Sequence, residues 1–328
     1  MKRLGAVVVA VAMIAGAWLL RDRLDGGDSS PGGGEQVEQL RLRCATELSA
    51  VCSALEEELD DVSVTVEQPG TTSDALVELA EGEDPGFDAW LADGPWGAIT
   101  ADNRGFANAD GQVLGESSGV LARSPSVIVV QESRTSALTD ACGGTLSWAC
   151  IGEQPTSLRV GLPNPERGDG LAVLAGAVAS QLGTTDYSAS DFDSPGFAGW
   201  FDRLTELSSD TPLGRQSPLA RALAAAGTFG VVGALEAQSV DLLRSRGGYV
   251  TIYPEPMTTA DITLTPRLGL DAEELVDRLG ADRLSAAAAA EGWRVDGDAP
   301  EGAGDVPALP DGDQLPGPGV LQRLREMW

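Results

Sequence analysis

The sequence predicts an α/β protein built around a largely parallel sheet, and three features of its pattern indicate this class. Short apolar or alternating runs typical of strands are interleaved with longer helical patterns. Turns rich in Gly, Pro and Asp separate these elements. The 328-residue chain is 42% hydrophobic, which suffices for a packed core. Since ligands of such sheets bind beyond the carboxyl ends of the strands, we look there for functional residues.

The first third of the body reads as strand, helix, strand, helix, strand. Residues 39–44 and 62–68 alternate apolar and polar side chains and predict two strands. Between them Thr46 is expected to cap a helix that continues to Leu59. Small or acidic residues follow the expected strands, and they are Thr46, Gly70, Thr71, Thr72, Ser73 and Asp93. The remaining expectations here are a turn at 69–74, a helix at 75–80 and a short strand at 87–91.

A second set of α/β elements follows a long expected strand at residues 119–130. The strand 158–162 leads through a Pro/Gly turn into an Ala-rich helix that is expected to start near Gly168, with Asp169 as its N-cap. Outward N–H groups at such a helix start form a cradle for an anion or polar ligand, although an ordinary βα corner explains the same pattern. The later expectations are a helix at 197–207, an apolar stretch at 230–236, an extended run at 248–256 and a helix at 272–279.

The N-terminus has the pattern of a targeting segment. Lys2 and Arg3 precede an apolar run at 4–20, about 25 Å long as a helix. We expect residues 1–23 to be an uncleaved signal-anchor with the basic residues inside the cell; a cleaved signal peptide, cut near Ala17, is the alternative. Residues 24–37 predict a flexible tether. The chain is thus expected in the cell membrane, single-pass, with its main domain outside the cytoplasm.

The four cysteines agree with an oxidising compartment. Each neighbouring pair is close in the sequence, so the simplest pairing is Cys44 with Cys52 and Cys142 with Cys150. A four-thiolate zinc site is the weaker alternative, because the spacing within each pair is longer than zinc sites use.

Charge and composition exclude several functions. The net charge of −28 argues against nucleic acid and anionic lipid as partners. The chain has no histidine, which removes His-dependent catalysis and His-ligated metal sites. Asp296-Gly-Asp298 and Asp311-Gly-Asp313 lack the further ligands of a calcium loop, so we expect no metal and no cofactor. Four tryptophans are expected in the core, although sugar stacking is the alternative, and they are Trp90, Trp96, Trp148 and Trp200.

The C-terminal tail, residues 296–328, combines a Pro/Gly/Asp-rich linker with a short amphipathic helix at 320–328. Val320, Leu321, Leu324 and Trp328 share one face of this helix. The helix is therefore expected to dock on the body or on a partner.

Element order and four phrases together resemble a known family. The phrases are Glu67-Gln-Pro-Gly-Thr-Thr-Ser-Asp74, Asp88-Ala-Trp-Leu91, Gly161-Leu-Pro-Asn-Pro165 and Tyr253-Pro-Glu-Pro256. They resemble the membrane-linked, molybdate/sulfate-like domains of high-GC bacteria within the type II periplasmic or extracellular solute-binding proteins, which are often continued by a von Willebrand factor A domain. The resemblance covers about residues 38–295 and implies two α/β lobes joined by two crossover strands. Lobe 1 would comprise residues 38–122 and 255–295, lobe 2 residues 130–248, with crossovers at 120–130 and 249–254.

The same resemblance implies a small solute clamped between the lobes. It places ligand groups at Thr46, Thr71, Thr72, Asp93, Ser124, Gly168, Asp169, Glu236 and Tyr253. Glu166 and Asp169 depart from an oxyanion site, because both are acidic where oxyanion binders present neutral donors; Arg167 or Arg123 would have to offset them. A cationic or sugar-like ligand therefore stays open.

Three functional classes follow from the sequence. The first is a membrane-tethered solute-binding protein for uptake or sensing, with a permease or a von Willebrand factor A-type protein as partner. The second is a binding fold without ligand that acts as an extracellular interaction or adhesion module. The third, an enzyme, is disfavoured because the sequence shows neither histidine nor a paired-carboxylate motif.

Overall fold

The structure is a computed structural model that describes residues 39–107, 111–208, 217–225, 227–301, 303, 306–312 and 314–328. The expected signal-anchor at 1–23 and the tether at 24–37 lie outside the described residues. Within the described ranges, no helix is long and apolar enough to cross a bilayer.

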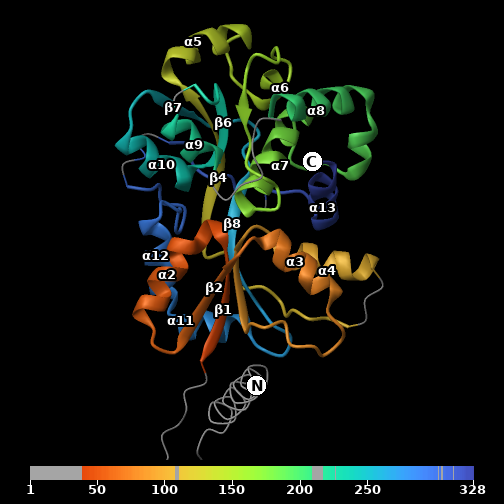
Figure 1. The fold of residues 1–328 in the computed structure, drawn as a ribbon, viewed down its shortest axis with the longest axis vertical. Coiled ribbons are helices and arrows are strands. Elements are labelled where there is room, and N and C mark those ends of the chain that lie inside the picture. Colours follow the sequence, from red (N-terminus) through yellow and green to blue (C-terminus); the bar gives the residue numbers. More distant parts are fainter. Residues whose placement is uncertain are drawn as a thin grey trace, which may run out of the picture. The chain divides into compact units, whose positions relative to one another are not determined.

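One eight-stranded mixed sheet runs through the body (Figure 1). Its order is β2-β1-β3-β8-β4-β6-β5, and β7 also pairs with β4. Strand β1 pairs in parallel with β2 and β3, as the strand–helix alternation predicted, whereas β8 joins β3 and β4 antiparallel. The strands are β1 (Leu40–Ala45), β2 (Val62–Glu67), β3 (Ala89–Asp93), β4 (Ala122–Gln131), β5 (Val160–Gly161), β6 (Val231–Leu235), β7 (Tyr249–Ile252) and β8 (Thr259–Pro266).

Strand β4 joins two halves of the body. Its residues 122–125 pair with β8, and residues 126–131 pair with β6 and β7. We name the half around β1, β2, β3 and β8 lobe 1 and the half around β5, β6 and β7 lobe 2. The expected crossover at 120–130 is this strand. The second expected crossover at 249–254 is shifted, because β7 lies in lobe 2 and the chain enters lobe 1 only after it, through 253–258.

Helices cover the sheet of lobe 1. In this lobe the helices α2 and α12 pack against each other, and α3 packs against α4. Apolar side chains at the helix faces toward the sheet are buried, as Leu55 of α2 and Leu275 of α11 illustrate. The helices of lobe 1 are η1 (Thr46–Leu48), α2 (Ser49–Glu58), α3 (Pro69–Glu78), α4 (Trp96–Phe106), α11 (Ala272–Leu279) and α12 (Ala281–Ala290).

Lobe 2 is organised around the long helix α7, which is buried through most of its length because its sequence is almost entirely Gly, Ala, Val and Leu. Small residues let other elements approach it closely; a Cβ on Gly176 would lie 2.7 Å from Ser126 Oγ. The helices of lobe 2 are α5 (Glu132–Ala141), α6 (Trp148–Ile151), α7 (Gly168–Leu182), η2 (Ala189–Asp193), α8 (Pro195–Ser208), α9 (Pro218–Ala224) and α10 (Glu236–Ser245).

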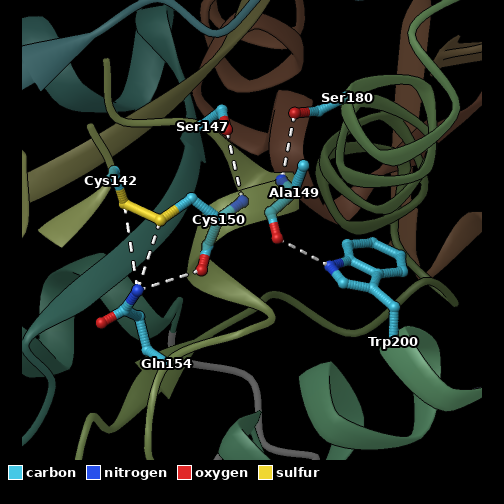
Figure 2. The surroundings of a disulfide bond; sticks show 7 residues. All are labelled: Cys142, Ser147, Ala149, Cys150, Gln154, Ser180 and Trp200. Carbon is cyan, nitrogen blue, oxygen red and sulfur yellow. Dashed lines mark hydrogen bonds between the residues drawn. A yellow bond between two sulfur atoms is a disulfide. The ribbon is translucent and has the colours of Figure 1, made fainter. Parts of the chain in front are cut away.

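Both expected disulfides are present, Cys44–Cys52 in lobe 1 and Cys142–Cys150 in lobe 2. The second joins the end of α5 to α6 (Figure 2). Helix α6 is tied further to its neighbours, because Trp200 Nε1 donates to the Ala149 carbonyl at 3.1 Å and the Ala149 N–H donates to Ser180 Oγ at 3.2 Å. The disulfide thus stabilises a short helix that could not persist alone.

Three local expectations are corrected. Thr46 caps no helix: it lies inside η1, and its hydroxyl donates to Glu47 Oε2 at 3.1 Å. The expected turn at 69–74 is the start of α3, with Pro69 in the first turn where its missing N–H costs nothing. Asp169 lies one residue inside α7, whose N-cap is Arg167.

The four tryptophans Trp90, Trp96, Trp148 and Trp200 are each at most 1% exposed and form part of the core, as expected. The C-terminal helix α13 (Pro318–Met327) docks on the body. It packs against α4 of lobe 1 and α7 of lobe 2, with Leu321 and Leu324 fully buried.

Candidate functional site

The two lobes meet along the carboxyl end of β3 and the start of α7. The Gly70 N–H of lobe 1 donates to the Glu166 carbonyl of lobe 2 at 2.9 Å. A Cβ on Gly168 would lie 2.2 Å from both the carbonyl oxygen and Oδ1 of Asp93. Glycine at 168 is therefore required for this close approach of the lobes.

Three carboxylates and one guanidinium converge at this junction. Glu47 and Asp93 come from lobe 1, and Arg167 and Asp169 come from lobe 2. Arg167 donates from Nε to Asp169 Oδ1 at 2.9 Å and from Nη2 to Asp169 Oδ2 at 3.1 Å. The same Nε lies 3.0 Å from Glu47 Oε1 across the lobes. Gln238 Nε2 adds a third donor to Asp169 at 2.6 Å, so that carboxylate is well satisfied.

Asp93 differs from the other two carboxylates. It is 0% exposed, and neither carboxylate oxygen has a hydrogen-bond partner among the described residues. Burial, together with the charges of Glu47 and Asp169, raises the pKa of Asp93 well above its ordinary value. Burial and Asp169 likewise raise the pKa of Glu47 to about 7, although Arg167 opposes the shift. Full ionisation of all three carboxylates would give the junction more negative charge than its single arginine balances, and the raised pKa values express this cost.

A polar pocket of about 780 Å³ opens over this cluster. Glu47 and Arg167 belong to both the cluster and the pocket wall, so the two are continuous. Both lobes contribute to the wall, which is lined by Thr46, Glu47, Ser49, Val66, Glu67, Gln68, Thr71, Arg167, Ser217 and Gln238. Val66 is the one apolar side chain in this set, so the pocket suits a polar solute rather than an apolar one.

A second buried ion pair lies behind the cleft, where the lobes connect. Arg294 donates from Nε and Nη2 to the two carboxylate oxygens of Glu236, each at 2.6 Å, and both side chains are at most 1% exposed. The Tyr253 hydroxyl also donates to Glu236, and Ser124 Oγ accepts the Ala237 N–H at 3.0 Å. Burial lowers the pKa of Arg294, but the hydrogen bond and charge of Glu236 outweigh burial, so the pKa of Arg294 is raised. These polar groups therefore bind one another, and their hydrogen bonds join the two lobes where the chain crosses between them.

The nine residues proposed from sequence thus fall into separate groups. Thr46 and Thr71 line the pocket, whereas Asp93, Gly168 and Asp169 are buried at the junction and do not line it. Ser124, Glu236 and Tyr253 belong to the connection behind it. The Thr72 hydroxyl donates to Glu67 at 2.7 Å and so supports a pocket residue from behind.

Sequence reasoning missed Glu47 and Gln238 as site residues and considered Arg167 only as a counter-charge. Glu47 lies in the turn directly after β1, so the same strand-end rule that selected Thr46 could have selected it. Gln238 lies in the first turn of α10, after an expected apolar stretch, where no helix had been predicted. Within the described ranges, no group of three or more Asp, Glu, Cys or His side chains is arranged to hold a metal ion.

Arg325 of α13 closes one side of the junction. Its Nη1 donates to Asp74 Oδ1 of lobe 1 at 2.9 Å, and its Nε donates to Glu166 Oε1 of lobe 2 at 2.7 Å. The arginine side chain is 7% exposed and also lies over the Trp96 ring at 5.9 Å. One side chain of the tail therefore connects both lobes.

No family model matches the chain, and no curated protein does. Solved structures do match. The periplasmic binding protein P5PA aligns over 88% of this chain and 98% of its own, with a TM-score of 0.59 at 15% identity. Apo FutA2 from Synechocystis PCC6803 aligns over 89% and 96%, with a TM-score of 0.58 at 12% identity. AfuA from Actinobacillus pleuropneumoniae, a periplasmic binding protein with fructose-6-phosphate bound, aligns over 88% and 97%, with a TM-score of 0.56 at 14% identity. At these identities the likeness concerns architecture, and the chain has the fold of the periplasmic binding proteins.

Proposed function

We propose that this protein is a solute-binding protein that clamps a small polar ligand between its two lobes and is not an enzyme. The observation that carries the proposal is the polar pocket of about 780 Å³ whose wall is shared by both lobes. Its size matches the clefts that enclose small ligands. AfuA, a protein of the same fold, was solved with a sugar phosphate bound, which supports a small-molecule ligand.

The proposed mechanism is closure of lobe 1 (38–122 and 255–295) on lobe 2 (130–248) about the connecting segments. A ligand held by groups from both lobes favours the closed arrangement by its differential affinity for it. The Arg294–Glu236 pair keeps the connection ordered while the lobes move.

We also propose that residues 1–23 tether the protein to the cell membrane, with the body outside the cytoplasm. The apolar run at 4–20 and the two disulfides support this arrangement. The specific relationship to molybdate/sulfate-like domains and a partnership with a permease or a von Willebrand factor A-type protein are proposals of the same kind, supported by the short sequence phrases alone.

A thermal-shift screen tests the function. The full chain is melted with sugars, sugar phosphates, amino acids, polyamines, oxyanions and metal salts. A ligand at about 100 times its dissociation constant adds about 2.7 kcal/mol of stability, which raises the melting temperature measurably.

Two variants show whether a hit binds in the pocket. Thr71→Trp fills the pocket from an exposed position on α3 and should abolish the shift, whereas Glu78→Trp, exposed at the far end of the same helix, should preserve it. No shift with any compound, in a protein that melts cooperatively, would instead favour the protein-interaction module.

A further inference from the structure

The junction between the lobes holds more carboxylates than positively charged groups. Three carboxylates, Glu47, Asp93 and Asp169, meet one guanidinium, that of Arg167, and the surrounding chain excludes water from them. Arg167 is already engaged by Asp169 and Glu47. Neither carboxylate oxygen of Asp93 accepts a hydrogen bond within the described ranges, and the charge of Arg167 offsets only part of the pKa rise that burial and the other two acids cause.

The charged residues of this cluster come from both lobes, so the cost of burying them depends on whether the cleft is closed. Glu47 and Asp93 approach Asp169 only when the lobes are together, as the 2.2 Å spacing between Asp93 Oδ1 and a Cβ on Gly168 indicates. Closing the empty cleft therefore requires either bound protons or a cation from outside. The pocket over Glu47 and Arg167 reaches the edge of this cluster.

The rest of the pocket wall adds no positive charge. Glu67 lines it as a second acidic side chain, and Arg167 is its one basic side chain. Arg43, the nearest further cation along β1, is paired with Glu67. An anionic ligand would meet the carboxylates of Glu47 and Glu67 at the wall, with Asp93 and Asp169 buried in the same cluster as Glu47, which opposes binding.

We propose that the solute of this cleft carries an ammonium or guanidinium group, which enters the pocket beside Glu47 and supplies positive charge to the cluster of Glu47, Asp93 and Asp169 when the lobes close. The proposal rests on the solute-binding function and names its ligand class: a small, polar organic cation. Hydroxyl and amide groups of Thr46, Thr71 and Gln238 suit the polar remainder of such a molecule.

Matched probes test the charge directly. Calorimetric titrations of the full chain compare glucosamine with glucose and glucose 6-phosphate, putrescine with 1,4-butanediol and succinate, and arginine with citrulline. A cationic member is expected to bind at least tenfold more tightly than its neutral or anionic counterpart. Asp93→Asn should weaken that binding at least tenfold, whereas Asp298→Asn, an exposed acid outside the cluster, should leave it unchanged.

Asp93→Asn gives a second, ligand-free measurement. The Asp93 carboxylate accepts no hydrogen bond from the described residues, so the substitution loses none. The melting temperature of the variant at pH 8 should therefore equal or exceed that of the wild type, and a clear fall would overturn the proposal. Tighter binding of glucose 6-phosphate or succinate than of the cationic probes, and tighter still in Asp93→Asn, would overturn the cationic ligand but not solute binding. Binding of a metal salt and of no organic probe would have the same consequence. A flat response to these probes and to the wider screen would overturn both.

Discussion

Glu47 makes the stability of the folded chain depend on pH near neutrality. Its pKa is raised by burial and by Asp169 to about 7, against about 4.3 for an unfolded glutamate. An acid whose folded pKa exceeds its unfolded pKa contributes stability below about pH 4 that is lost as the pH rises through 7. Asp93 shifts in the same direction, and the remaining charges that face Glu47 are those of Arg167 and Asp169.

Glu47→Gln should therefore flatten the pH dependence. Between pH 4 and pH 8 the unfolding free energy of the wild type is expected to fall by up to roughly 4 kcal/mol more than that of the variant. Urea titrations at pH 4 and pH 8 measure this difference. Glu78→Gln, at an exposed position, serves as the control. Identical profiles for wild type and Glu47→Gln would contradict the buried cluster.

The Arg294–Glu236 pair allows a second test at this scale. Arg294→Gln leaves Glu236 buried with its charge uncompensated, which should cost about 3–5 kcal/mol. Arg203→Gln breaks an ion pair of comparable type whose side chains are about half exposed, so its cost should stay below about 1 kcal/mol. Chemical denaturation of both variants gives the comparison, and equal costs would show that burial of the pair has no energetic importance.

At the residue scale, general rules of strand ends and helix starts drew attention to two residues of the buried cluster, and their role as ligand groups stays a prediction. Asp93 and Asp169 were selected because one ends a strand and the other starts a helix, and both lie in the cluster. The partnership of Arg167 with Glu47 could not be read from the sequence, because it exists only through the approach of two lobes. Ser124 and Glu236 are ligand groups only by resemblance, and the sequence could not show that Ser124 accepts from the Ala237 N–H or that Glu236 accepts from Arg294.

At the scale of elements, helix α13 contributes to stability although it follows a long irregular tail. Leu321 is fully buried between the helix and the body, so Leu321→Ala should cost about 2–5 kcal/mol. Arg323→Ala on the exposed face of the same helix should change stability by less than about 0.5 kcal/mol. Thermal unfolding of the two variants measures the difference. Equal melting temperatures would indicate that α13 does not pack on the body in solution.

Element prediction depended on how strongly local pattern and tertiary environment agreed. Strands β1 and β2 and helix α11 emerged within a residue or two, because alternation and amphipathicity mark their buried faces. Strand β8 was not predicted, although residues 259–266 largely alternate Thr with apolar side chains, because the Pro residues at 254 and 256 mark the end of an extended run just before it. Its antiparallel pairing at the centre of the sheet also lies outside the parallel scheme that the sequence predicted.

The whole molecule is understood as two lobes whose closure depends on charge at their junction. A solvated cleft would let Glu47, Asp93 and Asp169 ionise freely, whereas the closed cleft requires compensation. Alkaline pH without a cation should therefore favour separation of the lobes, and a bound cation should favour their contact.

The distance between the lobes, measured with one label on each, tests this account most directly. All four cysteines form disulfides, so labels can be placed at Glu78→Cys in lobe 1 and Asp202→Cys in lobe 2, both exposed positions. Pulsed electron paramagnetic resonance at pH 8 should show a long-distance population in the ligand-free full chain. Addition of a cationic solute found by titration should shift that population to the shorter distance of the closed cleft. One unchanged distance with and without a bound solute would contradict the account.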